Sequence, residues 1–424
     1  MKPYLHAKSW DSSLYANYVL MAFAFFLPIS HHITSIMMDI MVILLLLSGN
    51  LKERFREVTR DKIVIAFILM YSIHAFWMIG SEHLHIALLK LKEFMYLLYI
   101  IPIAMVLQKE FVLKVLGSFL VAMFFSELVS YGMSFGIVFP FVKVGIAANV
   151  PFMEFYTQYG TVLSITLGII LYQLLTNETL TKGMKLFSLF FFISASTNIF
   201  IVASRIGYGL YAISIVTVLM LVYKRQVLKL ALYGGMVIIL GYLVAYSSSP
   251  LFRIRMAAAI NDVQLMQQGH FDTSLGARAA FHYYSYDVIK EHLFFGVGTG
   301  DHIALVEHEL LTRESDKQEA QGIARNIQSG HNASLHSEYL DTFVQFGFIG
   351  LLVFFNLFYQ IYRYAQKDHF LKMIQYLMVV LMLFESIGTV IFIQSDVGMV
   401  FMFLMAVTIN LPSNRWIASS KPPL

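Results

Sequence analysis

Long apolar runs separated by short polar segments fill most of this chain. A helix needs about 20 apolar residues to cross a bilayer core of about 30 Å. Runs that approach this length are centred near residues 22, 41, 71, 97, 121, 165, 194, 214, 236, 353, 380 and 401. Apolar residues make up 58% of the sequence and charged residues only 13%, whereas soluble domains carry about a quarter charged residues. The pattern predicts an all-α polytopic membrane protein with about twelve transmembrane helices in a single membrane domain, residues 1–424.

Basic residues gather in four short segments, after the second, sixth, eighth and tenth apolar runs. These are LKERFREVTRDK, Lys182 with Lys185, YKRQVLK, and Arg363 to Lys372. With twelve spans all four lie on one side, and the positive-inside rule predicts that this side and both termini are cytoplasmic. The net charge of +4 therefore reflects loop residues and predicts no nucleic-acid partner. Cysteine is absent, which excludes disulfides and cysteine-based zinc sites.

One long polar segment, residues 247–337, interrupts the apolar runs and holds half of the histidines. We expect it on the periplasmic side, as one large loop. Within it, apolar or aromatic residues recur at helical spacing (Ala277, Phe281, Tyr284, Val288) and predict a helix that lies on the membrane or on the bundle. The following GVGTG is typical of a helix stop, with a phosphate cradle as the alternative. Residues 309–330 are polar and charge-mixed, which favours a mobile or lid-like segment.

Two arginines stand out as candidate anion-binding residues. Arg205 is the only charged residue between Leu186 and Tyr223, a length that fits two spans joined by an external turn at ASRIGYG. It is either an interfacial anchor or a site for an anionic headgroup, because guanidinium offers phosphate a fixed fork of donors. Arg278 opens the predicted loop helix, with His282 four residues later on the same face, where a solvated helix face is the alternative.

The segment HNASLHSEYLDTFVQFGFIG, residues 331–350, places polar chemistry directly before the tenth run. His331 and His336 are five residues apart, about 140° around a helix, so they make poor joint metal ligands and we predict no metal site. His336 lies at headgroup depth, where a neutral imidazole can take a proton from a sugar hydroxyl. Glu338 and Asp341 fall in the first turns of the predicted helix, where they stabilise its start or take part in the chemistry.

Charge also occurs inside the fourth apolar run. Lys90, Lys92 and Glu93 lie there, and because charges within a span almost always pair, an internal ion pair is the simplest expectation.

Taken in order, these motifs resemble those of the bacterial O-antigen ligase and O-antigen polymerase superfamily. The features are an SR pair at an external turn, an arginine in SLGAR, FFGVGTG, and HSEYLDTFVQFGFIGLL. The resemblance covers about residues 150 to 365. Ser337 stands where the superfamily more often has asparagine, and residues 309–330 match no piece of the pattern.

The resemblance implies a GT-C-type glycosyltransferase of the bacterial inner membrane that needs no metal or other cofactor. It would move an O-antigen glycan from undecaprenyl diphosphate to a sugar hydroxyl of lipid A-core on the periplasmic side, with inversion at the anomeric carbon. Carried over by position, the resemblance makes Arg205 and Arg278 ligands of the donor diphosphate and His336 the base. Accessory candidates are His331, His282 and Glu338.

Two alternatives remain from the sequence. A polymerase that extends one lipid-linked glycan with another would share this fold and these residues; one dominant external loop favours the ligase. A flippase or transporter that binds membrane lipids without chemistry would place charged or helix-breaking residues near the bilayer midplane of paired segments, whereas the polar residues here gather in one external loop.

Overall fold

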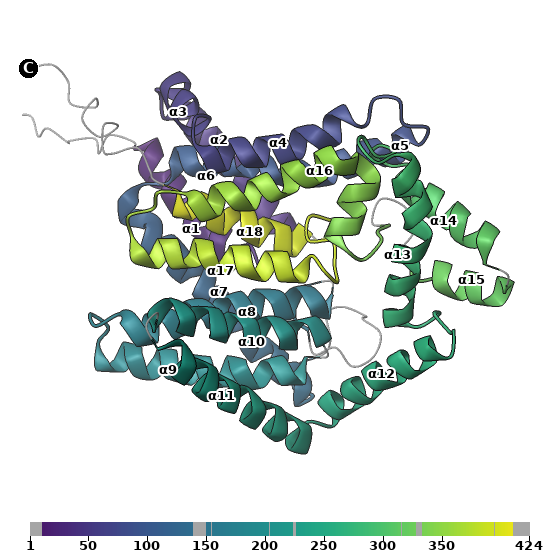
Figure 1. Ribbon diagram of the computed structural model, residues 1–424. Helices are drawn as coiled ribbons and strands as arrows, with labels where there is room; N and C mark the ends of the chain where they lie inside the picture. The colour runs from purple at the N-terminus through teal and green to yellow at the C-terminus, as the bar shows by residue number, and fades with distance from the viewer. Residues whose placement is uncertain are drawn as a thin grey trace, which may run out of the picture.

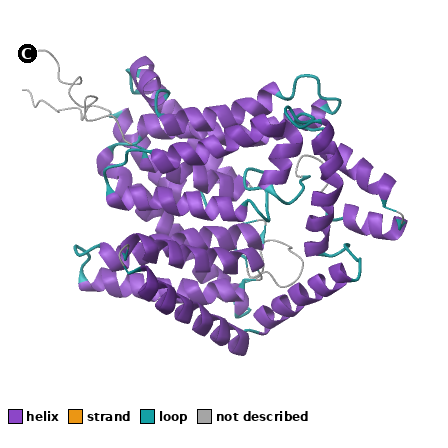
Figure 2. Ribbon diagram, viewed as in Figure 1, coloured by secondary structure: helices purple, strands orange, loops and turns teal. Residues whose placement is uncertain are grey.

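The computed structural model describes residues 11–138, 150–153, 155–202, 204–223, 226–314, 316–327, 333–393 and 395–409. Throughout these residues the regular structure is helical, and no strand occurs among them (Figure 2). The all-α fold predicted from the apolar runs is therefore confirmed for the described part of the chain. Both terminal segments, whose orientation the sequence predicted, lie outside the described residues.

The helices follow one another as a closely packed bundle with a group of helices at one end (Figure 1). The first part comprises α1 (Ser12–Phe26), α2 (His31–Leu47), α3 (Leu51–Val58), α4 (Lys62–Phe76), α5 (Leu84–Glu93), η1 (Phe94–Tyr99), α6 (Ile100–Val106), η2 (Lys109–Phe111), α7 (Val112–Ser134), α8 (Tyr156–Thr176), α9 (Lys182–Ile201) and α10 (Arg205–Val222). The second comprises α11 (Val227–Ser248), α12 (Pro250–Gln267), α13 (Ser274–Glu291), α14 (His302–Arg313), α15 (Lys317–Ala324), α16 (Glu338–Arg363), α17 (His369–Glu385) and α18 (Ser395–Thr408).

Each of the twelve predicted apolar centres falls inside a helix. Within the described residues, five helical segments are long and apolar enough to cross a membrane: α7 together with η2, α8, α9, α10 and α16. A sixth would be the bent pair formed by α11 and α12, whose axes differ by 104°. The helices α1, α2, α4 and α18 are apolar but shorter, at 10–17 residues. The protein is thus a multi-pass membrane protein, while the number of twelve spans stays a prediction.

The contact between α8 and α10 fixes where α10 begins. A Cβ atom on Gly160 of α8 would lie 3.2 Å from the Cα of Gly207 on α10, so only glycine allows the two backbones to pass this closely. Ser204 caps α10, because its side chain accepts a hydrogen bond from the backbone N–H of Gly207 at 3.0 Å. Arg205 is consequently the first residue of α10 and lies beside α8.

The long polar segment folds as α12 to α15 and covers one end of the bundle, at the right of Figure 1. The predicted helix is α13, and the four residues expected on its apolar face are all buried: Ala277, Phe281, Tyr284 and Val288. Residues 309–330, expected to be mobile, instead contain the end of α14 and all of α15 within their described part. Leu310 and Ile323 anchor these two helices in the same apolar cluster as Phe281.

The GVGTG segment packs against α16 at a break in that helix. Gly347 has φ 62° and ψ −154°, so the helical hydrogen bonding is interrupted there. A Cβ on Gly347 would lie 2.4 Å from the backbone carbon of Phe294, so no other residue fits at this position. The carbonyl of Val344 accepts a hydrogen bond from Val297 N–H at 3.0 Å, and Phe348 N–H donates to the carbonyl of Leu293 at 2.9 Å, so backbone hydrogen bonds join the segment to α16 on both sides of the break.

The N–H groups of the first four residues of GVGTG, 296 to 299, all donate to protein carbonyls. Gly298 N–H donates to Gln345 at 2.9 Å, and Thr299 N–H donates to Trp77 at 3.0 Å. A phosphate cradle needs free N–H groups, so the cradle alternative is not supported and the segment serves to fasten α13 and α14 to the bundle.

Candidate active site

Arg205 presents a guanidinium with unused donors at the start of α10. Its Nη1 donates to Oδ2 of Asp262 on α12 at 2.9 Å, and the side chain is 30% exposed. Its Nε is buried without a hydrogen-bond partner among the described residues. The positive end of the α10 dipole adds to this charge. The residue is thus suited to bind an anion, because a buried donor without a partner is costly until a ligand accepts from it.

Arg278 of α13 lies close to Arg205. Its Nε donates to the carbonyl of Gly388, just after α17, at 3.2 Å, and its Nη1 donates to the carbonyl of Ser274 at 2.6 Å. Burial lowers the pKa of Arg278, and the charge of Arg205 acts in the same direction. Ile206, the neighbour of Arg205, would lie 3.4 Å from a Cβ on Gly388. The two arginines predicted from sequence are therefore brought together around the end of α17.

A third arginine, Arg255 of α12, joins them and was not among the predicted residues. Its guanidinium lies over the ring of Tyr156, 5.2 Å from the centroid, and its Nε is buried without a hydrogen-bond partner in the described structure. Nearby Arg253 instead donates to the carbonyls of Tyr246 and Ser247 and caps α11. The sequence FRIRMA shows two arginines but not which of them turns inward. We call Arg205, Arg255 and Arg278 the arginine cluster.

The arginine cluster carries excess positive charge. Among the described residues, Asp262 is the only carboxylate that forms an ion pair with the cluster, through Arg205. Guanidinium groups that converge with spare N–H donors are well matched to phosphate oxygens, which accept several charge-assisted hydrogen bonds. Among the described residues no group of three or more His, Cys, Asp or Glu side chains is arranged to hold a metal ion.

His336 stands in the loop before α16 with its ring held on two sides. The ring stacks on Phe281 of α13, with centroids 6.2 Å apart and planes 18° apart. Its Nε2 lies 2.8 Å from the carbonyl oxygen of Asn326. Because a carbonyl only accepts hydrogen bonds, Nε2 carries the proton, and the lone pair of the neutral ring is on Nδ1.

The surroundings of His336 favour its neutral form. Burial lowers the pKa of His336, and the Asn326 carbonyl opposes this shift while the positive charge of Arg278 adds to it. A neutral imidazole with its lone pair on Nδ1 is a competent proton acceptor near pH 7. The ring can therefore act as a base through Nδ1.

The end of α17 connects His336 with the arginine cluster. The carbonyl of Ser386 accepts hydrogen bonds from the Ser337 hydroxyl at 3.2 Å and the Glu338 N–H at 2.9 Å. Two residues later, the carbonyl of Gly388 accepts from Arg278. The base candidate and the cluster thus share one short segment of backbone.

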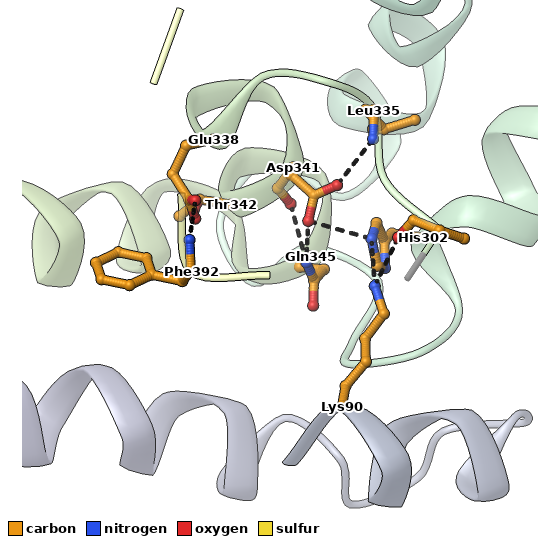
Figure 3. A network of polar contacts seen from close by, with 9 residues as sticks. Lys90, His302, Leu335, Glu338, Asp341, Thr342, Gln345 and Phe392 are labelled. Carbon is orange, nitrogen blue, oxygen red and sulfur yellow. Dashed lines mark hydrogen bonds and ion pairs between the residues drawn. The ribbon is translucent and has the colours of Figure 1, made fainter. Parts of the chain in front are cut away.

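The other predicted residues lie elsewhere. His282 is exposed on α13, and its neighbour Phe281 makes the contact with His336. Glu338 is buried, and its carboxylate accepts from the Phe392 N–H and the Thr342 hydroxyl, each at 3.3 Å (Figure 3). His331 lies outside the described residues.

Lys90 is buried as the sequence suggested, in a network that also includes His302, Asp341 and Gln345 (Figure 3). We call these four residues the buried frame. Lys90 Nζ lies 3.3 Å from His302 Nε2, and His302 Nε2 lies 3.3 Å from Asp341 Oδ2. His302 was missed because it lies more than 200 residues from Lys90, with no spacing that relates the two.

Comparison with known proteins supports the resemblance given by the motifs. Residues 189–355 match the family model described as O-antigen ligase, which confirms that resemblance. The family covers O-antigen ligases and polymerases, which are glycosyltransferase-like enzymes with lipid-linked glycan substrates. The matched residues include the whole arginine cluster and His336. A search of curated proteins found no match to the chain.

Proposed function

We propose that this protein is an O-antigen ligase that moves a glycan from undecaprenyl diphosphate to a sugar hydroxyl of lipid A-core. The observation that carries the proposal is that Arg278 and Ser337, the residue after His336, both hydrogen-bond to the end of α17. Arg205 lies close enough to Arg278 to act on its charge, and Arg255 lies over Tyr156, which also acts on Arg278. Spare guanidinium donors suit the diphosphate of the donor, and the Nδ1 lone pair of His336 suits the acceptor hydroxyl. The substrates and the direction of transfer go beyond the family match.

The proposed reaction is a direct displacement. Nδ1 of His336 takes the proton of the acceptor hydroxyl while the oxygen attacks the anomeric carbon of the glycan. The bond between that carbon and the diphosphate oxygen breaks, so configuration inverts and undecaprenyl diphosphate leaves with the bonding electron pair. The negative charge that develops on the leaving group is stabilised by the arginine cluster. The step needs no covalent intermediate and no redox partner.

An apolar groove gives the carrier lipid a place beside this site. The groove, of about 700 Å³, lies between α10 and α17, and Tyr362 of α16 completes it. Val216, which lines it, follows Arg205 by eleven residues on the same helix, or about 16 Å at 1.5 Å per residue. A polyprenyl tail whose diphosphate contacts Arg205 would thus meet the groove deeper in the bilayer.

We place the site on the periplasmic side of the inner membrane, from the distribution of basic residues. A topology reporter fused after Ser249 should read periplasmic, and one fused after Arg225 should read cytoplasmic. The opposite pair of results would overturn the proposal, because lipid A-core and the polymerised glycan would then be on the wrong side of the site.

The decisive experiment uses purified protein, an undecaprenyl-diphosphate glycan and lipid A-core. A ligase forms a conjugate and releases undecaprenyl diphosphate. Lengthening of the lipid-linked glycan in the absence of acceptor would establish the polymerase alternative, and no glycan-linked product would favour the transporter. In cells, deletion should leave core-only lipopolysaccharide with polymer still on the carrier, whereas loss of a polymerase leaves core bearing one repeat unit.

A further inference from the structure

His336 has a backbone conformation that its own residue type does not favour. Its φ of 54° lies in the left-handed region, which is uncommon for residues other than glycine, although histidine adopts it more often than most. The side chain contacts of Phe281 and Asn326 orient the ring but do not fix the backbone. The backbone of His336 is instead held by contacts of the residues on each side of it.

On the C-terminal side, the chain is fixed by the end of α17. The N–H of Glu338 donates to the carbonyls of Ser386 and Thr389 at 2.9 and 3.0 Å. On the N-terminal side, the buried frame makes the contacts. Lys90 Nζ donates to the carbonyl of Ala333 at 3.2 Å, and Asp341 Oδ1 accepts from the N–H of Leu335 at 3.1 Å (Figure 3).

The buried frame itself is tied together from three distant elements. Asp341 accepts a hydrogen bond from Gln345 at 2.6 Å and contacts His302 of α14, which also contacts Lys90 of α5. All four side chains are at most 2% exposed. A network of this kind is costly to bury, and apolar residues of similar volume often stabilise a protein as well or better. Its presence is better explained by the geometry it imposes than by stability.

We propose that Lys90, His302 and Asp341 are positioning residues, which hold residues 333–335 so that His336 is fixed in its left-handed conformation with Nδ1 toward the acceptor hydroxyl. This inference rests on the proposed function of His336. It predicts that the frame acts on the rate of the chemical step, since a displacement of the base by about 1 Å can cost about 10²-fold in rate. It predicts no effect on donor binding, which belongs to the arginine cluster.

The main test is the double variant Lys90→Met/Asp341→Leu, assayed by transfer from an undecaprenyl-diphosphate glycan to lipid A-core. Removing both charges leaves no lone buried ion, so the fold should persist. We expect kcat to fall by about 10- to 100-fold while KM for the donor stays within about twofold of wild type. An unchanged kcat, or a fall matched by an equal rise in donor KM, overturns the proposal.

Lys90→Met/Asp341→Asn is the conservative variant, which also leaves no lone buried ion. The amide oxygen at position 341 can still accept from Leu335, so this variant should retain more activity than Lys90→Met/Asp341→Leu; equal losses would contradict the positioning role. Gln375→Leu is the matched control, because Gln375 is as buried but bonds Thr408 in the bundle, away from His336. If kcat falls as far in this control as in the double variant, then removing any buried polar side chain has the same effect, and the proposal is refuted.

Failure of this inference is distinguishable from failure of the proposed function. If wild-type protein transfers glycan and His336→Ala does not, while the double variant is normal, the frame has no positioning role. If wild-type protein forms no conjugate, the function itself is wrong.

Discussion

The arginine cluster and the buried frame are both polar groups inside an apolar bundle, but they differ in how fully their hydrogen bonds are used. Arg205 and Arg255 each keep a buried Nε without a partner among the described residues. Asp341, in contrast, accepts from Leu335 and Gln345 and contacts His302. The arginine cluster has charged donors left over, whereas the central carboxylate of the frame is saturated and only neutral atoms there, His302 Nδ1 and Gln345 Oε1, lack a partner among the described residues.

This difference separates binding from positioning. A carboxylate whose acceptor positions are filled within the protein has no need of a ligand, and it is held in one geometry. A site with unused charged donors is incomplete until an anion arrives. His336 lies between the two regions and receives one influence from each: its backbone neighbours contact the frame, and the charge of Arg278 acts on its ring.

Substitution of His336 should have the largest effect. In His336→Ala the base is lost, and because general-base catalysis contributes about 10²- to 10⁴-fold, transfer should fall by that factor with donor binding retained. The measurement is conjugate formation by purified protein. His282→Ala, one residue beyond Phe281 on the exposed side of α13, is the control and should remain near wild type. Comparable losses of transfer in both variants would show that His336 is not the base.

Arg205→Lys keeps the charge of the arginine cluster but removes the paired N–H donors of the Arg205 guanidinium. We expect the KM for the donor to rise by about 10- to 100-fold, the equivalent of one charge-assisted hydrogen bond of about 1.5–3 kcal/mol. Arg253→Lys is the control, since Arg253 caps α11 and should not affect the donor. If lysine at position 205 supports normal transfer, Arg205 is only an interfacial anchor.

Arg255→Gln tests the residue that the sequence did not identify. Its guanidinium lies over Tyr156 and forms no ion pair with a carboxylate in the described structure. Its removal should therefore raise donor KM by about tenfold, less than the loss of the guanidinium at Arg205. Donor titrations at fixed acceptor provide the measurement. If only the acceptor KM changes, Arg255 contacts the acceptor and not the donor diphosphate.

The smallest expected effect is on pH dependence. Because burial and Arg278 lower the pKa of His336 from 6.5, the ring stays neutral through pH 7, and kcat should fall only as pH drops below 6.5. The Asn326 carbonyl and Asp341 act in the opposite direction. In Arg278→Gln one lowering influence is lost, so the acid limb of the kcat profile should move to higher pH. A limb that stays in place would show that another group titrates.

Much of the fold follows from the sequence because apolar periodicity is a local property. The buried face of α13 was predicted residue by residue, since its helical spacing survives in the structure. The helices in the described part of residues 309–330 were not predicted, because charged residues dominate the composition there while the apolar Leu310 and Ile323 pack in the same cluster as α13.

The site was predicted where one residue stood out from its surroundings and missed where several had to meet. Arg205 is conspicuous in an apolar stretch, and His336 lies in a recognisable motif. Arg255 and His302 belong to polar segments where nothing in the spacing marks them. Their contacts with Tyr156 and Lys90 depend on how α12 and α14 pack against elements far away in sequence.

The break at Gly347 limits how this stretch of sequence can change through evolution. Asp341 and Gln345 belong to the short helical piece before the break, where they contact each other within the buried frame. The end of this piece is held by hydrogen bonds from the N–H groups of residues 297 and 298. Adding or deleting one residue between His336 and Gly347 would turn that piece by about 100° and carry Asp341 away from Lys90 and His302. Insertions and deletions should therefore be tolerated between α14 and α15 and selected against here, so that relatives differ in the length of the former segment and share the eleven-residue interval from His336 to Gly347.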